Sequence, residues 1–375
     1  MRHAQVRTLL AALSLTACIA PTSQLGRISP ELVQREQLLQ QRLVIESGLA
    51  EQRRLADLVF PMVRAAVPLC GRHVTTRTGV WVTNLHAYDR TFQDAARSLG
   101  FSDTLMVVGV AAGSPAERAG ITVGDRVLGI AGSPAPMGRM AIAQFSALVT
   151  PKPVARGIPG LASAPTAFVV HRAGLEAPAV EVPIAIPPDT VCAYGSTAVK
   201  DDQLNAWADG QQVVVTTAMM RFAATDDELA VVVAHEIAHN AMRHIDAKQK
   251  NATMGALFGA VLDIAAATQG INTGGDFTNS GAAIGGMTYS QDFEREADYV
   301  GMYVLARSGR QFTQAANFWR RMAQESPGSI KYASSHPTTA ERFLRLEETA
   351  TEIARKRDAG DALLPTLKPR PGTSP

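Results

Sequence analysis

The order of apolar and polar residues along the chain predicts two long helices. Between Pro30 and Leu69, apolar residues recur at helical spacing among Gln, Glu and Arg side chains. The positions expected to form one buried stripe are Leu32, Leu39, Leu43, Leu49, Leu55, Leu58 and Val59. A second helix is indicated by the apolar run 229–234, because Thr225 and Glu228 precede it at the spacing of a capping box.

Short strands are predicted between and beside these helices. Runs rich in β-branched residues lie at 107–110, 126–130, 168–172 and 180–184, and a further strand is expected at 211–217. Residues 141–149 are expected to form a helix within this region. The pattern as a whole predicts an α+β protein.

The second helix carries the sequence HEIAH. His235 and His239 are four residues apart, so both imidazoles lie on one helix face and can bind one metal ion. Glu236 follows the first histidine and can act as general base on a water molecule activated by Zn²⁺. The motif therefore predicts a hydrolase with one zinc ion per chain, and peptide-bond hydrolysis suits it best. A chance pair of histidines is the alternative.

A third metal ligand must come from elsewhere in the sequence. The metzincin pattern HExxHxxGxxH is absent, since Met242 and Ile245 occupy the positions of its glycine and last histidine, and His244 does not fit it. Further along, Glu294 and Asp298 share one face of a predicted helix. Glu294 could bind the metal while Asp298 orients a ligating histidine. A solvated charged face is the other interpretation of these two residues.

These motifs together resemble metallopeptidase family 48, the gluzincin group of the HtpX, BepA and Oma-type proteases. The resemblance covers about residues 190–350 and implies that His235, His239 and Glu294 bind zinc, with Asp298 behind them. It also implies that the strand at 211–217 is an edge strand able to pair with an extended substrate. His336, in a late His-Pro segment, is expected near the metal as an oxyanion or capping residue, unless it belongs to an ordinary surface turn.

A short apolar stretch near the N-terminus predicts a signal peptide. Arg2 and Arg7 precede residues 9–15, which are too few to form a stable membrane anchor. The sequence LTAC ending at Cys18 resembles the bacterial lipobox, whose cysteine is lipidated. Because Ile19 and not aspartate follows, we expect a lipid anchor in the outer membrane facing the periplasm. An ordinary secretory signal is the alternative.

The net charge and the number of cysteines bear on the partners of the protein and on its covalent structure. The formal net charge of +2, from 36 basic and 34 acidic residues, gives no reason to expect a nucleic-acid partner. With Cys18 removed from the count, Cys70 and Cys192 remain as a pair in an oxidising compartment. We expect them to form a disulfide, with two free buried thiols as the alternative.

The region between those cysteines resembles a bacterial PDZ domain, on the run GSPAERAG at 113–120 and GDRVLGI at 124–130. Such domains bind a peptide as an added strand. Residues 98–101, SLGF, are the expected carboxylate-binding loop, and the groove strand after it is reduced to 102–104. Peptide binding and a structural spacer are both compatible with this sequence.

Three further segments complete the organisation. Residues 252–262 are apolar, but Asp263 and the length of the segment argue against a membrane span. The glycine-rich stretch 272–286 is predicted to be a mobile loop that gates the cleft. The C-terminal tail, 351–375, which is Pro-rich from Ala359 onward, is predicted to be disordered.

We therefore expect a zincin-type, mainly helical metalloprotease domain with a small edge-exposed sheet, preceded by a PDZ-like β-barrel domain and an N-terminal helix. The expected function is a zinc metalloendopeptidase that removes misfolded or unassembled proteins from the bacterial cell envelope. Its partners would be protein or peptide substrates and the membrane. A chaperone or scaffold with structural zinc, and a peptidase of short peptides, are the alternatives. The expected units are 1–18 (signal peptide), 19–70 (linker and helix), 71–188 (PDZ-like), 189–350 (peptidase) and 351–375 (tail).

Overall fold

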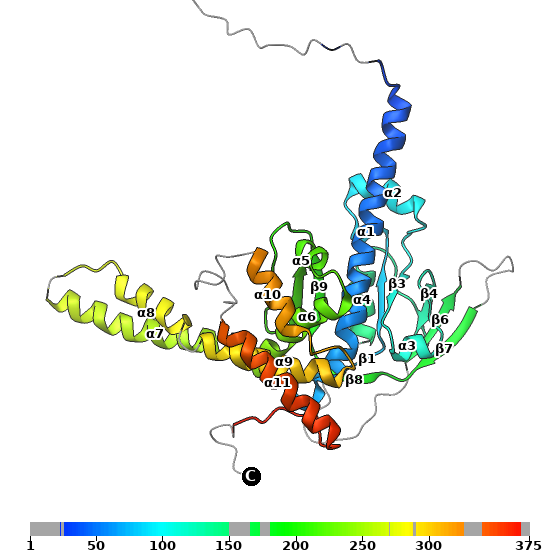
Figure 1. Ribbon diagram of the computed structural model, residues 1–375. Coiled ribbons are helices and arrows are strands. Elements are labelled where there is room, and N and C mark those ends of the chain that lie inside the picture. Colours follow the sequence, from blue (N-terminus) through cyan, green and yellow to red (C-terminus); the bar gives the residue numbers. More distant parts are fainter. Residues whose placement is uncertain are drawn as a thin grey trace, which may run out of the picture.

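The computed structural model describes residues 23, 26–149, 166–172, 181–269, 271–287, 290–325 and 340–368 (Figure 1). The predicted lipidation site, Cys18, and the predicted oxyanion residue, His336, lie outside the described residues.

Helices make up most of the described chain, and the strands are short. The helices are α1 (Pro30–Ala65), η1 (Val67–Leu69), η2 (Leu85–Ala87), η3 (Arg90–Phe92), α2 (Gln93–Ser98), α3 (Pro115–Arg118), α4 (Ala141–Val149), α5 (Thr217–Phe222), α6 (Asp226–Met242), α7 (His244–Thr268), α8 (Asp276–Met287), α9 (Ser290–Arg307), α10 (Ala315–Glu325) and α11 (Ala340–Asp358). The strands are β1 (Val74–Arg77), β2 (Val80–Thr83), β3 (Met106–Val110), β4 (Arg126–Ile130), β5 (Ser133–Pro134), β6 (Thr166–His171), β7 (Glu181–Ile186), β8 (Asp189–Cys192), β9 (Gly195–Val199), β10 (Ala206–Ala208) and β11 (Gln212–Thr216).

Helix α1 forms as the sequence predicts, but its stripe is buried only in the second half. Ser29 caps the helix by accepting a hydrogen bond from the Leu32 backbone N–H, and a proline stands at its first position. Leu55, Leu58 and Val59 are buried in the main core. The expectation for the first half is wrong, because these leucines are exposed: Leu32, Leu39 and Leu43. There α1 extends beyond the body of the protein, where no described element packs against that stripe (Figure 1).

The PDZ region is built on an antiparallel sheet with the order β2-β3-β4-β6-β7, and β5 pairs with β4. Its own core contains the apolar side chains of Leu105, Ile130, Phe145, Phe168 and Ile186, which come from the sheet, the segments beside it and α4. Strands β2 and β7 end this path, and no described pairing joins them. The sheet is therefore open, and the closed barrel included in the sequence-based expectation does not form.

Residues 98–101 do not form the expected carboxylate loop. They end α2, and Phe101 is buried against α1 and η2 residues in a small separate core. The carbonyl of Gly100 accepts a hydrogen bond from Arg126 Nη2 at 2.8 Å. Strand β2 forms one of the two edges of this sheet and follows a turn at Gly79 with a positive φ of 84°. Glycine is favoured there because a side chain is strained in this conformation.

A disulfide joins the ends of the PDZ region. Cys70 and Cys192 are bonded across a sequence separation of 122 residues. Cys192 ends β8, which pairs antiparallel with β1, so that Val74 lies opposite Cys192. Both cysteines are buried in the main core. The PDZ region is thus inserted through two strands held side by side.

The peptidase region contains a three-stranded sheet with the order β10-β11-β9. β11 pairs antiparallel with β10 and parallel with β9. The prediction that residues 211–217 form an edge strand is therefore wrong, because β11 lies in the centre. Strand β9, which was not expected, covers one side of it, and β10 supplies the edge.

The glycine-rich segment 272–286 is not a loop throughout. Residues 276–287 form α8, which packs along α7 in a helical hairpin that projects from the body (Figure 1). The prediction of a mobile loop is wrong here, because the glycines allow close helix packing. By length and composition, α7 is also the one helix in the described part of the chain that could cross a membrane, which is weak support for a span by itself.

The C-terminal segment is ordered beyond the expected boundary at 350. Helix α11 continues to Asp358, and Ile353 is fully buried in the main core. Beyond the helix, the Leu363 carbonyl accepts a hydrogen bond from Arg307 Nη1 at 3.4 Å. The Thr366 backbone N–H donates to the Tyr299 hydroxyl at 3.1 Å. Disorder from residue 351 is therefore wrong as far as residue 368.

Candidate metal centre

Helix α6 holds the HEIAH motif in the main core. Thr225 and Glu228 form the predicted capping box, with the Glu228 backbone N–H donating to Thr225 Oγ1 at 3.2 Å. The apolar run that follows packs on all sides, so the helix is buried along its length. His235, Glu236 and His239 are each 2% exposed. The helix therefore carries three polar side chains into a place where each needs a partner.

Helix α9 lies close against α6 at the same level. Gly301 faces the α6 backbone, and a Cβ atom on it would lie 3.1 Å from the Ala234 carbonyl oxygen. The absence of a side chain there lets the two helix backbones approach. On the preceding turns of α9, Glu294 and Asp298 are 5% and 7% exposed. The packing thus brings both carboxylates to the histidines of α6.

Three donor groups meet in a small triangle. His235 Nε2 and His239 Nε2 are 3.1 Å apart. Glu294 Oε2 lies 3.2 Å from His235 Nε2, and the other oxygen of the same carboxylate, Oε1, lies 3.4 Å from His239 Nε2. Bonds of about 2.0–2.2 Å to a tetrahedral zinc ion give ligand separations of roughly 3.3–3.6 Å. Each of the three separations is close to such a ligand–ligand distance, and one donor atom from each residue lies within 4.8 Å of the other two, so the donor set fits a metal ion.

The electrostatics of this triangle favour a cation. Burial disfavours the charged form of His235, but the carboxylates of Asp298 and Glu294 outweigh it and raise the pKa of His235 to about 9. Burial lowers the pKa of His239 to about 4, against the opposite effect of Glu294. His235 thus lies in a negative potential that favours a cation. His239 keeps a neutral ring, whose nitrogen lone pair is available to a metal.

Asp298 orients the first histidine from behind. Its Oδ1 lies 2.9 Å from His235 Nδ1, so the ring donates there and directs Nε2 to the donor triangle. Arg342 of α11 makes a two-pronged contact with Asp298, at 2.7 and 2.8 Å. Although burial works against ionisation of Asp298, Arg342 and His235 hold its pKa below the usual value. The Arg342 guanidinium lies 3.8 Å from the centre of the Trp319 ring.

A second chain of contacts supports the other histidine. His244 Nδ1 is 2.9 Å from His239 Nδ1, and His244 Nε2 is 2.8 Å from Glu296 Oε2. If His239 donates to His244, and His244 donates to Glu296, then His239 Nε2 is left as an acceptor facing the triangle. His244 is 1% exposed and its ring stacks on Phe293 at 4.7 Å. His244 is therefore placed as a positioning residue and is not itself a ligand.

The break between α6 and α7 makes this second chain possible. Arg243 adopts the left-handed conformation, with φ 63° and ψ 37°, and so ends α6 and turns His244 back toward His239. Asp246 accepts hydrogen bonds from Arg243 Nε and Nη2 at 2.9 and 2.5 Å, which stabilises the turn. Next to the second histidine, Asn240 ties α6 to the sheet, because its Oδ1 accepts from the Gly210 backbone N–H at 2.8 Å.

The structure thus brings His235, His239, Glu294 and Asp298 together, with Glu236 buried on the same helix. Arg342 was not among the residues predicted for the site, and His244 was considered only as a ligand. No local spacing signals Arg342, because it lies 44 residues after Asp298 on another helix. For His244, the one signal in the sequence was its position, five residues after His239.

Such a centre, carried by two crossed helices beside a small sheet, defines a metallopeptidase domain of the zincin type. Residues 175–350 match peptidase family M48, and residues 106–152 match a PDZ domain. The C-terminal half of the chain is therefore similar to M48 peptidases, and a region similar to a PDZ domain precedes it.

Two curated relatives show the extent of this similarity. The Beta-barrel assembly-enhancing protease of Yersinia pestis is 36% identical over 146 residues, which cover 37% of this chain and 29% of that protein. The mitochondrial metalloendopeptidase OMA1 of Saccharomyces cerevisiae is 28% identical over 162 residues, covering 40% and 45%. The chain thus spans less than half the length of these two relatives. Among solved structures, the HtrA3 PDZ domain bound to a phage-derived ligand covers 32% of this chain and 89% of its own, with 19% identity and a TM-score of 0.22.

The contact between His244 and His239 predicts an effect on metal affinity. His244→Phe keeps an aromatic ring against Phe293 but removes the acceptor for His239, so zinc affinity should fall about 10–100-fold. Competition with a chromophoric chelator measures this affinity without any assay of activity. Glu296→Gln should weaken binding in the same direction.

Asp292→Asn is the matched control, because Asp292 is an exposed acid on the same helix that pairs with Arg295. Its zinc affinity should equal that of the unaltered chain. Equal affinity in His244→Phe and the unaltered chain, with intact circular dichroism, would contradict the positioning role.

Proposed function

We propose that this protein is a zinc-dependent endopeptidase of the bacterial cell envelope, which hydrolyses peptide bonds in misfolded or unassembled envelope proteins. The observation that carries the proposal is the buried triangle of His235, His239 and Glu294, with Glu236 beside the first histidine in a family M48 domain. The Beta-barrel assembly-enhancing proteases among the relatives support the envelope location.

The donor set favours zinc among common metals. Two imidazole nitrogens and one carboxylate are the ligands of many catalytic zinc sites, which keep a fourth position open. A structural zinc site usually has four protein ligands, often cysteines. Cys70 and Cys192 are bonded to each other and take no part in the cluster.

Bound zinc would polarise the scissile carbonyl and lower the pKa of a water molecule. Glu236 would accept the proton of that water and pass it to the leaving amine, which a carboxylate next to the ligating histidine is placed to do. The contacts from Asp298 to His235 and from His244 to His239 would keep both rings in one orientation during these transfers. His336 stays our candidate for stabilising the oxyanion.

The sheet supplies a place for an extended substrate. β10 packs near α6 and pairs with β11 on one side, while no described strand pairs with its other side. A substrate backbone could add there as a further strand, and main-chain hydrogen bonds would hold it with little dependence on sequence. This suits an enzyme that acts on unfolded chains.

A chaperone or scaffold with structural zinc is the rival from a different functional class. It has no need for a carboxylate at position 236, where burial of an acidic group carries a cost in stability. The burial of Glu236 at 2% exposure next to the donor triangle therefore favours catalysis. A peptidase of short peptides would use the same chemistry and differ in the length of its products.

Replacement of Glu236 tests the proposed reaction. Glu236→Gln keeps the size of the side chain but removes the base, so kcat/KM for an unfolded protein such as casein should fall about 10²–10⁴-fold. Zinc content, measured by atomic absorption, should stay at one ion per chain. Glu348→Gln, an exposed position on α11, is the matched control and should keep full activity. Equal cleavage by Glu236→Gln and the control would refute the mechanism.

We also propose a peptide ligand for the PDZ domain. A groove of about 470 Å³ runs beside β2 and α4, and its lining includes Val80, Val82, Ile142 and Ser146. Because β2 is an edge strand, a peptide can pair with it while its side chains contact α4. Residues of α1 and the peptidase sheet, including Gly195, complete the lining. A peptide held there would therefore lie between the two domains.

The groove predicts a specific loss of peptide binding. Ser146→Arg places a bulky side chain in the groove, so the Kd of a fluorescent decapeptide with apolar C-terminal residues should rise at least about tenfold. Fluorescence polarisation provides the measurement. Ala147→Arg, at the next position of α4 and outside the lining, should leave Kd unchanged. Absence of peptide binding to the unaltered chain would favour the spacer role.

The lipid anchor at Cys18, in the outer membrane and facing the periplasm, is a further part of the proposal. It rests on the sequence LTAC and on the 11 residues between Cys18 and Pro30, where α1 begins. Extended chain of that length reaches about 40 Å, enough to hold the domains away from the bilayer surface.

Metabolic labelling tests the anchor. Cells that express the full chain should incorporate radiolabelled palmitate into it, and Cys18→Ala should abolish the label because no other residue takes the acyl chain. Ser14→Ala, in the same apolar stretch, should keep the label. Incorporation that survives in Cys18→Ala contradicts the anchor.

A further inference from the structure

The α7–α8 hairpin differs in character from the rest of the surface. It projects from the body between the two helices that carry the donor triangle, because α6 precedes it and α9 follows it (Figure 1). Residues 251–287 include two charged residues, Asp263 and Asp276, and neither lysine nor arginine. Such a long solvent-facing hairpin would normally carry many charges.

The two helices contact each other through glycine. A Cβ atom on Gly259 would lie 2.0 Å from the Phe277 carbonyl oxygen, and one on Gly281 would lie 2.1 Å from the Gly255 carbonyl oxygen. Gly255 and Gly259 are four residues apart, as are Gly281 and Gly285. Close packing through this spacing is typical of helix pairs in membranes, where large apolar side chains gain nothing by facing inward.

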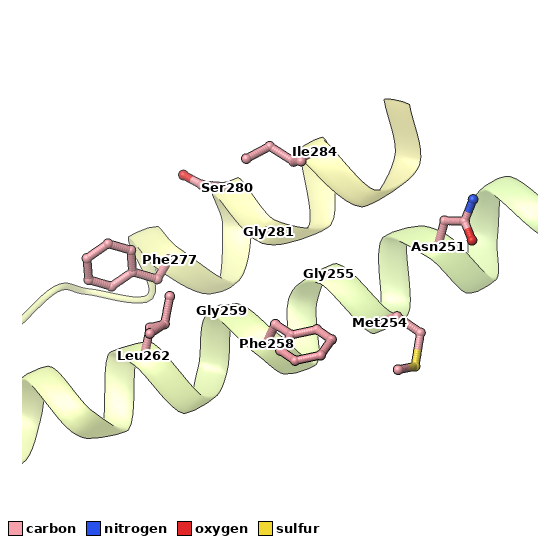
Figure 2. Close-up of a pocket in the computed structure, with 10 residues that line it drawn as sticks. All are labelled: Asn251, Met254, Gly255, Phe258, Gly259, Leu262, Phe277, Ser280, Gly281 and Ile284. Atoms are coloured by element: carbon pink, nitrogen blue, oxygen red, sulfur yellow. The ribbon is translucent and has the colours of Figure 1, made fainter. Parts of the chain in front are cut away.

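The large apolar side chains of the hairpin point outward. Met254, Phe258, Leu262, Phe277 and Ile284 line a shallow apolar groove on one face of the pair (Figure 2). Phe258 is 71% exposed and Ile284 is 65% exposed. Leu257 and Val261 continue the same face of α7 and are also exposed. A helix pair that is stable in water alone would bury these groups between the helices.

The opposite edge of the hairpin is polar and internally bonded. Asp263 is nine residues after Met254, half a turn around the helix from it. Its oxygens accept hydrogen bonds from Thr273 Oγ1 at 2.5 Å, Thr278 Oγ1 at 2.6 Å and the backbone N–H groups of Phe277 and Thr278. The hairpin thus has an apolar face and, away from it, a carboxylate already satisfied by the turn.

We propose that the apolar face of the hairpin inserts into the surface of a lipid bilayer, parallel to it, with the Asp263 edge toward water. Insertion would bury the outward apolar side chains in the boundary between headgroups and acyl chains. A full span is disfavoured, because the 12 residues of α8 reach about 18 Å and the hydrocarbon core is about 30 Å thick.

The lipid surface fits this face better than a second protein chain. Specific protein interfaces have a polar rim and about one hydrogen bond per 100–200 Å². Asn251 and Ser280 are the polar side chains among the residues that line the groove, and none of these residues is charged. A fluid acyl layer requires no matching donors or acceptors. The proposed contact is separate from the acyl chain on Cys18 and does not depend on it.

Vesicle binding tests the proposal with the full chain carrying Cys18→Ala, so that no acyl chain contributes. Neutral phosphatidylcholine vesicles should bind this protein equally well at low and high salt, because the apolar face has no cation to attract headgroups. Met254→Ser with Phe258→Ser should lower the partition coefficient at least about tenfold. Leu39→Ser with Leu43→Ser, on the exposed stripe of α1, is the matched control and should leave it unchanged.

Fluorescence quenching identifies the face that enters the lipid. In vesicles of brominated phosphatidylcholine, Phe258→Trp should add a quenched signal. Ala267→Trp, on the opposite side of α7, should add an unquenched one. Failure of the Cys18→Ala protein to bind vesicles would overturn the proposal. So would equal quenching at both positions, or a change of oligomeric state in place of vesicle binding when Met254 and Phe258 are replaced.

Discussion

The close crossing of α6 and α9 is the constraint on which the candidate site depends. Gly301 lets α9 lie against the α6 backbone beside His235, and this approach brings Glu294 and Asp298 to the two histidines. An alanine at position 301 would place its Cβ atom 3.1 Å from the Ala234 carbonyl oxygen, so the helices would have to separate by a few tenths of an ångström. Because metal ligands must lie within about 0.2 Å of their ideal distances, such a change would act directly on the donor triangle.

Burial makes each polar group at this crossing dependent on its partners. Removing one partner of a buried ion pair costs about 3–5 kcal/mol, because the other charge is left without compensation. This applies to Arg342 and Asp298, whose side chains are both buried, so that their contact holds α11 to the site as well as orienting the His235 ring. The contact of Glu296 with His244 also joins α9 to α7, but the Glu296 side chain is exposed. Stability and ligand geometry depend on the same contacts, since α11 and α9 supply their charged ends.

The PDZ region and the α7–α8 hairpin are two insertions in the peptidase region, and neither interrupts the packing around the donor triangle. The PDZ region enters through β1 and β8, which the disulfide between Cys70 and Cys192 holds together. The α7–α8 hairpin enters where Arg243 breaks α6 away from α7, immediately after the second histidine. Each insertion begins and ends at adjacent points of the peptidase region, so each can present its own surface without moving the donor triangle. The groove beside β2 and the apolar face of the hairpin are those surfaces.

Local sequence signals were enough to predict α1, the capped α6 helix, the shared face of His235 and His239, the pairing of the two cysteines and the strands that follow the PDZ motif. Each of these depends on spacing within a helix or strand, or on the number of cysteines available to pair. The central position of β11, the helical state of residues 276–287, the groove at β2 and the roles of Arg342 and His244 depended on packing. The residues that place β11, Arg342 and His244 belong to other helices and strands. For residues 276–287, glycine is compatible both with a loop and with a close contact between helices, so composition alone did not decide between them. Hydrophobic spacing predicts which face of an element is apolar, but only the assembled fold decides what covers that face. For this reason Leu55 and Leu39, on the same predicted stripe, end in the core and in solvent respectively.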